Sequence, residues 1–168
     1  MRLGALVGRA VLALLMATGT VWAQEDSSAE SDAVVYSAPD DADMAKAVEG
    51  ARSTLPNVLE RAATGGIPME AIQLKVAIPK EGGGNENIWV EGIVQIDETT
   101  FEALLANTPH ALPGKSRGDR HRFQRDEITD WLFIANGQMH GAYTLRVTLP
   151  FLPKEQAAEF RAMLAPLP

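Results

Sequence analysis

The sequence predicts a small α+β domain, in which N-terminal helices cover one face of a curved, mainly antiparallel sheet and a further helix follows at the C-terminus. Three observations predict this class. Apolar residues first recur at helical spacing, and after Gly65-Gly66 they alternate as strands do. A helical pattern returns after Pro153. The chain has 168 residues, enough for one such domain, which we place at residues 40–168.

Residues 1–23 have the pattern of a secretory signal peptide. Two arginines precede an uncharged apolar stretch at residues 10–17, and a small residue, Ala23, stands at the cleavage position. The apolar stretch is shorter than the ~20 residues that cross a bilayer. We therefore expect export to the periplasm or the medium after cleavage near Ala23-Gln24, with an uncleaved anchor as the alternative.

Residues 24–39 are interpreted as an acidic, flexible leader. Between Gln24 and Asp43 there are seven acidic side chains and no basic one, a composition that buries too little apolar surface to order itself. Removal of residues 1–23, which contain two arginines and no acidic residue, takes the formal net charge from −7 to −9. That charge disfavours nucleic-acid binding, and cleavage would leave no stable membrane anchor. The absence of cysteine excludes disulfides, thiol nucleophiles and Cys-ligated zinc.

The domain opens with a helical stretch that is interrupted by a proline. Pro56 removes a backbone hydrogen bond from a helix interior, so we expect the helix either to end near Thr54 and restart or to kink there. Gly65-Gly66 is expected to end the helical stretch. Its apolar positions recur at spacings of three and four: Met44, Val48, Ala51, Leu55, Val58, Leu59 and Ala62.

Period-two alternation predicts a strand at residues 71–79 and a second strand at residues 88–96, with Gly92 as a bulge. The glycine-rich residues 80–86 between them are interpreted as a hairpin loop. A phosphate-binding loop is the weaker interpretation, because a helix does not follow. Residues 99–106 fit either a third strand or a short helix.

Residues 128–134 predict another strand, and Asn136-Gly137 is a strong hairpin signal. Residues 144–149 alternate and favour a further strand, with a short helix as the alternative. Pro153 stands where a last helix can begin. The apolar face of that helix is Ala157, Phe160, Met163 and Leu164.

The three histidines, His110, His121 and His140, do not have the spacing of a zinc motif. No nucleophile elbow or cofactor motif is present either. We therefore expect neither a cofactor nor a metal site.

Asp130 is the strongest candidate among the carboxylates, because it lies beside Trp131 in the most apolar stretch. A buried aspartate more often accepts structural hydrogen bonds, from turn N–H groups or from an arginine such as Arg146, than it performs catalysis. If the protein is an enzyme, we expect Asp130 to work with His140 or Glu91 as acid and base.

The candidate binding residues surround this aspartate and the aromatic strands. Both strand tryptophans are also expected core residues, because aromatic side chains in strands pack first. The candidates are Asp130, Trp131, Trp89, Tyr143, Thr144 and Arg146.

Residues 115–125 carry a local excess of positive charge in an acidic protein. They are interpreted as a solvated strand whose charges discourage edge-to-edge pairing, with an anion-binding patch as the alternative. A third hypothesis is that the acidic leader covers them. The basic residues are Lys115, Arg117, Arg120, Arg122 and Arg125.

Several stretches match a known family in order and spacing: residues 51–56, 87–91, 118–119, 128–131 and 137–147. These stretches, within residues 43–149, resemble the YegJ-like bacterial family, domain of unknown function 2314. The resemblance implies a small α+β domain and no established activity. Ala142 stands where the resemblance implies a second glycine.

From these observations we predict an exported protein whose domain is a non-catalytic binding or interaction module of the cell envelope. Its expected partner is an unidentified protein or a small polar ligand. The alternative is a small hydrolase-like enzyme that uses Asp130 with His140 or Glu91.

Overall fold

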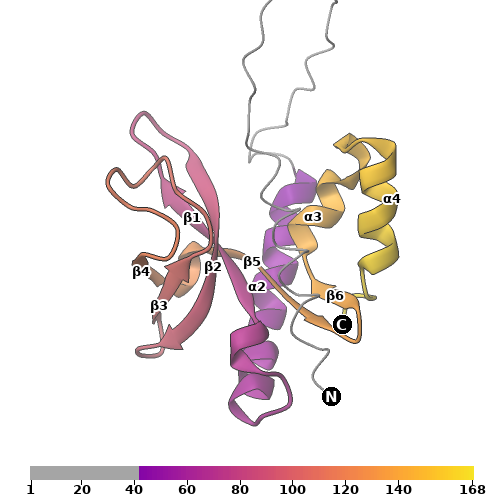
Figure 1. Ribbon diagram of the computed structural model, residues 1–168, viewed down its shortest axis with the longest axis horizontal. Coiled ribbons are helices and arrows are strands. Elements are labelled where there is room, and N and C mark those ends of the chain that lie inside the picture. The colour runs from indigo at the N-terminus through magenta and orange to yellow at the C-terminus, as the bar shows by residue number, and fades with distance from the viewer. Residues whose placement is uncertain (1–41) are drawn as a thin grey trace, which may run out of the picture. The chain divides into compact units, whose positions relative to one another are not determined.

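The computed structural model describes residues 42–168. The predicted signal peptide (residues 1–23) and acidic leader (residues 24–39) lie outside the described residues. The described chain forms a six-stranded antiparallel sheet with helices before and after it, so the predicted α+β class is confirmed (Figure 1).

The first described helix, α2 (Ala42–Ala63), contains Pro56 and does not end near Thr54. Because proline has no N–H group, the carbonyl of Arg52 lacks the donor that an α-helix would give it. Tertiary packing therefore outweighs the helix-breaking tendency of Pro56. The buried face of α2 is Ala47, Ala51, Leu55, Val58 and Leu59.

The C-terminal end of α2 is closed by the two glycines, as predicted. Gly65 has a φ of 79° and donates its N–H to Ala62 O at 3.1 Å. Gly66 N donates to Arg61 O at 2.8 Å. These bonds satisfy carbonyls of the last helical turn, and the helix ends before the chain enters the sheet.

The sheet has the strand order β4-β3-β2-β1-β5-β6, and every neighbouring pair is antiparallel. The predicted strands at residues 71–79, 88–96 and 128–134 are confirmed, and residues 99–106 form a strand rather than a helix. The strands are β1 (Gln73–Pro79), β2 (Asn85–Gln95), β3 (Thr100–Leu105), β4 (Arg120–Gln124), β5 (Ile128–Ala135) and β6 (Gln138–Gly141).

The predicted bulge at Gly92 is also confirmed. The register between β2 and β3 shifts between Glu91 and Val94, and Gly92 has a φ of 63°. A positive φ suits glycine, which has no Cβ atom. The extra residue changes which side chains of β2 face the core, so Ile93 is buried and Val94 is exposed.

The main core lies between α2 and one face of the sheet. α2 contacts β5 and α3, and Figure 1 shows α2 between strands β1–β4 and the helices α3 and α4. The side chains of the strands that face α2 form the other half of this core. Its fully buried strand residues include Leu74, Val76, Val90, Phe101, Leu105 and Phe123.

The strand favoured for residues 144–149 is wrong. These residues form most of a short helix, α3 (Tyr143–Thr148), which a 3-10 helix (Leu149–Phe151) extends. Ala142, with a φ of 53°, turns the chain out of β6 and into the helix. The alternating pattern is misleading here because the contact that fixes this helix comes from Asp130 on β5, which is distant in sequence.

The last helix, α4 (Lys154–Met163), is confirmed, with Ala157 and Phe160 buried. The chain after α4 returns to the sheet, where Leu164 forms a parallel bridge with Met139 of β6. Ala165 N donates to Met139 O at 2.9 Å, so the C-terminal segment covers the outer edge of β6. No helix within residues 42–168 is long and apolar enough to cross a bilayer.

Candidate functional site

Asp130 lies on β5, has no exposed surface, and accepts four hydrogen bonds. Its Oδ1 accepts Trp131 N at 2.8 Å and Tyr143 N at 3.0 Å. Its Oδ2 accepts Thr144 N at 2.8 Å and Thr144 Oγ1 at 2.6 Å. The carboxylate thus satisfies the first N–H groups of α3, which a helix cannot satisfy by itself. Asp130 caps α3 from another element of the fold.

Gly141 and Ala142 bring α3 within reach of this carboxylate. Gly141 has a φ of 76°, and a Cβ atom there would overlap the carbonyl oxygen of Trp131. That carbonyl accepts Ala142 N at 2.9 Å. The close approach requires glycine at position 141, while Ala142 adopts a left-handed conformation that alanine tolerates at some cost.

Lys75 joins the same cluster, although the sequence did not single it out. Lys75 is the register partner of Asp130, and its ammonium donates to Thr144 Oγ1 at 2.6 Å. It also lies 4.8 Å from the ring centroid of Trp89, a cation–π contact. Burial lowers the pKa of Lys75 from its usual value, and the nearby Asp130 carboxylate offsets part of this effect. The Thr144 hydroxyl therefore links a cation to an anion.

Trp131 and Tyr143 connect this cluster to α2. Trp131 Nε1 donates to Ala51 O at 3.0 Å and to Thr54 Oγ1 at 3.1 Å. The Tyr143 hydroxyl lies 3.0 Å from Thr54 Oγ1, and the two aromatic rings meet edge to face at 5.8 Å. Both aromatic side chains are buried, so these contacts hold three elements together.

Arg146 does not bind Asp130. Its Nε donates to Gly141 O at 3.2 Å and its Nη2 to Ala165 O at 2.6 Å, so it ties α3 to the C-terminal segment. Burial lowers the pKa of Arg146, and Tyr143 and Asp130 offset part of this effect.

Neither His140 nor Glu91 forms a hydrogen bond with Asp130 within the described residues. The His140 ring stacks on Phe133 at 4.7 Å and lines a pocket of about 180 Å³, whereas Glu91 faces Leu104 across β2 and β3. Every side-chain hydrogen bond of Asp130 within the described residues goes to Trp131, Tyr143 or Thr144. This closed geometry argues against the hydrolase alternative, because no face of the carboxylate is open to a substrate.

The basic residues 115–125 do not form one open patch. Arg120 and Arg122 both approach Glu102, at 2.5 and 3.5 Å, and the bond from Arg120 holds the pKa of Glu102 below its ordinary value. Lys115 Nζ donates to the Arg120 carbonyl at 3.1 Å, and the Arg117 side chain is exposed. Most of this charge is thus engaged by the chain itself.

Lys115 also helps to close the free edge of the sheet. Arg125 N donates to Thr99 O, so His121 and Phe123, which have the same register, also direct their backbone groups toward β3. The backbone groups of Arg120, Arg122 and Gln124 therefore point away from the sheet. At one end of that outward row Lys115 binds Arg120 O. At the other end, the Glu127 carboxylate accepts Gln124 N at 2.6 Å.

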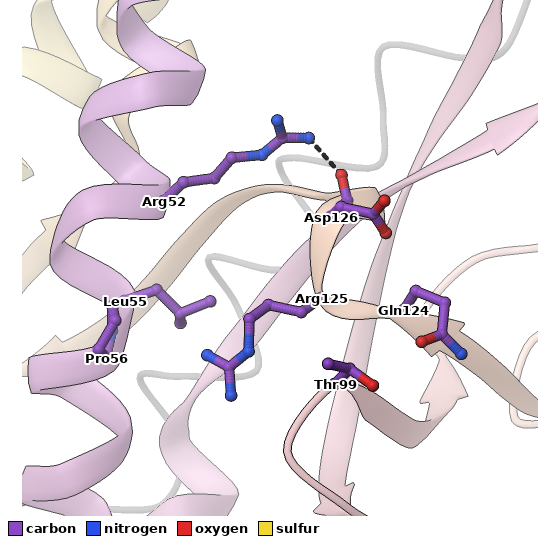
Figure 2. A pocket seen from close by; sticks show the side chains of 7 residues that line it. All are labelled: Arg52, Leu55, Pro56, Thr99, Gln124, Arg125 and Asp126. Atoms are coloured by element: carbon purple, nitrogen blue, oxygen red, sulfur yellow. Dashed lines mark hydrogen bonds between the residues drawn. The ribbon is translucent and has the colours of Figure 1, made fainter.

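Arg125, the last basic residue of the segment, turns away from β4 into a pocket of about 550 Å³ (Figure 2). The pocket lies between α2 and the 3-10 helix Arg125–Glu127. Arg52 reaches across it from α2 toward Asp126, and Arg125 reaches in the opposite direction toward Leu55 and Pro56. Its lining residues are Arg52, Leu55, Pro56, Thr99, Gln124, Arg125 and Asp126.

Backbone carbonyls hold both arginines in place. Arg52 donates from Nε to Ile128 O at 2.7 Å and from Nη2 to Asp126 O. Arg125 donates to Glu98 O from Nε at 3.0 Å and from Nη2 at 2.8 Å, and its guanidinium lies 5.2 Å from the ring centroid of Phe101. The pocket is therefore formed by fixed polar groups over an apolar floor.

Sequence reasoning missed Arg52 and Lys75 for different reasons. Arg52 stands in one of the stretches that carried the family resemblance, but only the fold brings it to Arg125. Lys75 lies on the polar side of an alternating strand, where a lysine is common and gives no sign of a functional role. Only the register with β5 places it beside Asp130. Within residues 42–168 no group of three or more His, Asp or Glu side chains could hold a metal ion.

Comparison with known proteins agrees with the resemblance. A family model described as "Uncharacterized protein conserved in bacteria (DUF2314)" matches residues 41–165. The chain is 24% identical to the uncharacterized protein YegJ of Escherichia coli K12 over 151 residues, 90% of this chain and 96% of YegJ. It is 27% identical over 77 residues to a putative ankyrin repeat protein of Neisseria meningitidis serogroup B, which covers 46% of this chain and 30% of that protein. No solved structure matches.

Proposed function

The chain belongs to the DUF2314 family of uncharacterized bacterial proteins, and for this member we propose a non-catalytic binding domain that works in the cell envelope. The observation that carries the proposal is the pocket between α2 and the 3-10 helix Arg125–Glu127. Concave sites with an apolar lining and a few fixed polar groups are where proteins usually bind small ligands.

The contrast between two parts of the molecule supports binding over catalysis. The Asp130 carboxylate accepts four hydrogen bonds, and it caps the N-terminus of α3. At the pocket, each guanidinium donates two N–H groups to backbone carbonyls, and its other three N–H groups have no acceptor within residues 42–168. Unused donors over an apolar floor favour recognition of a ligand.

The envelope part of the proposal is supported by the signal-peptide pattern of residues 1–23. Expression of the full chain in a bacterium, followed by periplasmic fractionation and mass spectrometry, tests it. We expect a periplasmic protein that begins at Gln24. An intact chain that starts at Met1 and stays in the cytoplasm would contradict export.

The binding part is tested by mapping small ligands with backbone amide NMR spectra. A panel of carboxylates, phosphates, amines and sugars is added to the purified protein. We expect at least one class to shift the amides of Arg52, Leu55, Thr99, Arg125 and Asp126. Shifts confined to other regions, or turnover of any panel member, would overturn the proposal.

A further inference from the structure

We propose that this pocket recognises a carboxylate that carries an apolar group, as an acylated aliphatic amino acid or a peptide C-terminus does. The inference rests on the proposed binding function and names the chemistry of the ligand. Three features of the pocket carry it: the free N–H groups of the two guanidinium groups, the apolar floor, and the acidic side chain of Asp126 at the rim.

The guanidinium groups of Arg52 and Arg125 are positioned without being neutralised. Within the described residues their hydrogen-bond partners are neutral carbonyl oxygens, and neither guanidinium forms an ion pair with a carboxylate. Arg120 and Arg122 differ, since both are paired with Glu102. A guanidinium fork that is already fixed loses little freedom on binding and matches the two oxygens of a carboxylate.

The apolar floor is formed by Leu55 and Pro56. Leu55 is anchored in the core, while Pro56 is an exposed residue inside a continuous helix. Proline is the residue that a helix interior tolerates least, and local rules of this kind are most often broken at functional sites. Its ring gives the pocket a rigid apolar surface next to Arg52.

Asp126 sets the charge that the pocket accepts. Among the described residues, two arginines and one aspartate line the pocket, so this lining carries a net charge of about +1. A monoanion balances this charge, whereas a dianion such as a phosphate monoester brings a second negative charge toward Asp126. The charge balance therefore favours a carboxylate over a phosphate.

The test compares matched probes on the purified protein by amide NMR titration. N-acetyl-leucine supplies a carboxylate with an aliphatic group, N-acetyl-leucinamide replaces that carboxylate with a neutral carboxamide, and phenyl phosphate carries a dianion on an apolar ring. We expect N-acetyl-leucine to shift the pocket amides and to bind at least about tenfold more tightly than either other probe, the range expected for a charge-assisted hydrogen bond.

Variants separate the roles of the charged side chains. Arg125→Gln should weaken N-acetyl-leucine binding about tenfold or more, whereas Arg122→Gln, on the neighbouring strand and paired with Glu102, should leave it unchanged. Asp126→Asn keeps the backbone carbonyl that holds Arg52 and should strengthen phenyl phosphate binding relative to N-acetyl-leucine. This second variant keeps the test decisive if Arg125→Gln disturbs the fold.

The outcomes distinguish this inference from the proposed function. If an amine or a sugar shifts the pocket amides and neither anion does, the binding function stands and the carboxylate inference fails. Equal binding of N-acetyl-leucine and its amide, or an unchanged probe preference in Asp126→Asn, also overturns the inference. If no probe class shifts the pocket amides, both proposals fail.

Discussion

At position 141 the backbone leaves no room for a side chain. A Cβ atom there would lie 2.5 Å from the ring of Trp131 and would overlap its carbonyl oxygen. Gly137 has the same φ of 76°, but a Cβ atom added there meets nothing within 4 Å. The two glycines therefore separate the effect of close approach from that of backbone conformation.

We predict that Gly141→Ala lowers the free energy of unfolding by about 3 kcal/mol or more, because Trp131 must move. Gly137→Ala should lower it by only about 1 kcal/mol, the penalty of a left-handed conformation. Urea unfolding of both variants measures the difference. Equal losses would show that Trp131 accommodates the added methyl group.

The Asp130 carboxylate is the second residue whose removal should be felt throughout the fold. In Asp130→Asn, the amide NH₂ would face N–H and O–H donors of Tyr143 or Thr144, so at least one buried donor loses its acceptor. We predict a loss of about 2–3 kcal/mol, which lowers the melting temperature by roughly 10 °C.

Asp126→Asn is the matched control for this experiment, because its side chain is exposed. Its melting temperature should change by less than about 2 °C. If Asp130→Asn melts at the same temperature as the parent protein, the carboxylate is not required by the fold.

Asp130 and Arg146 show how much of a side chain's environment can be inferred from the sequence. The residue type and apolar surroundings of Asp130 were enough to anticipate hydrogen bonds from turn N–H groups. They were not enough to name the partners, and Arg146 binds Gly141 O and Ala165 O instead. The partners depend on the path between residues 130 and 144, which passes through four residues with a positive φ: Asn136, Gly137, Gly141 and Ala142.

At the scale of elements, sequence periodicity predicted long segments well and the short helix poorly. α2, β1, β2 and α4 are long enough for their apolar spacing to be distinctive. α3 has six residues, too few for alternation and helical spacing to be told apart. Its conformation is decided by the distant Asp130 cap, which local patterns do not contain.

The contact between β1 and α3 predicts a dependence of stability on pH. Lys75 titrates at its usual value near 10.5 when unfolded and at a lower pKa when folded. Between the two pKa values the unfolded chain binds more protons, so the free energy of unfolding rises with pH in that window. Below the folded pKa the ammonium is charged in both states and this contribution is at its least favourable.

We therefore predict that the free energy of unfolding of the parent protein, minus that of Lys75→Met, increases as the pH is raised toward about 10.5. Urea unfolding of both proteins between about pH 7 and pH 10 measures it. The exposed Lys80, replaced in the same way, serves as the control. A difference for Lys75→Met that stays constant with pH would contradict the buried position of the ammonium.

At the scale of the whole molecule, the family and the α+β class could be read from the chain, but the pocket could not. Its lining comes from α2, from Thr99, and from residues 124–126, which are widely separated in sequence. The basic segment attracted attention through its charge, yet four of its five cations bind the chain itself. Charge is visible in a sequence, whereas its compensation depends on the fold.

The acidic leader gives a prediction that involves the whole chain. If residues 24–38 shield the basic segment, their removal should raise the affinity for heparin a few-fold at low salt, and added salt should abolish the gain. Elution from a heparin column at several salt concentrations measures this. A Gly/Ser replacement of equal length controls for chain length. Unchanged elution would exclude shielding.

The closed edge of β4 has one further consequence, for hydrogen exchange with solvent. His121 and Phe123 share the inward register of Arg125, so their amide protons lie between two strands. The amides of Arg120 and Arg122 face outward, and that of Gln124 is held by Glu127. In deuterated water, slow and fast exchange should alternate along this strand until Gln124, where the carboxylate of Glu127 protects an amide that the sheet leaves open.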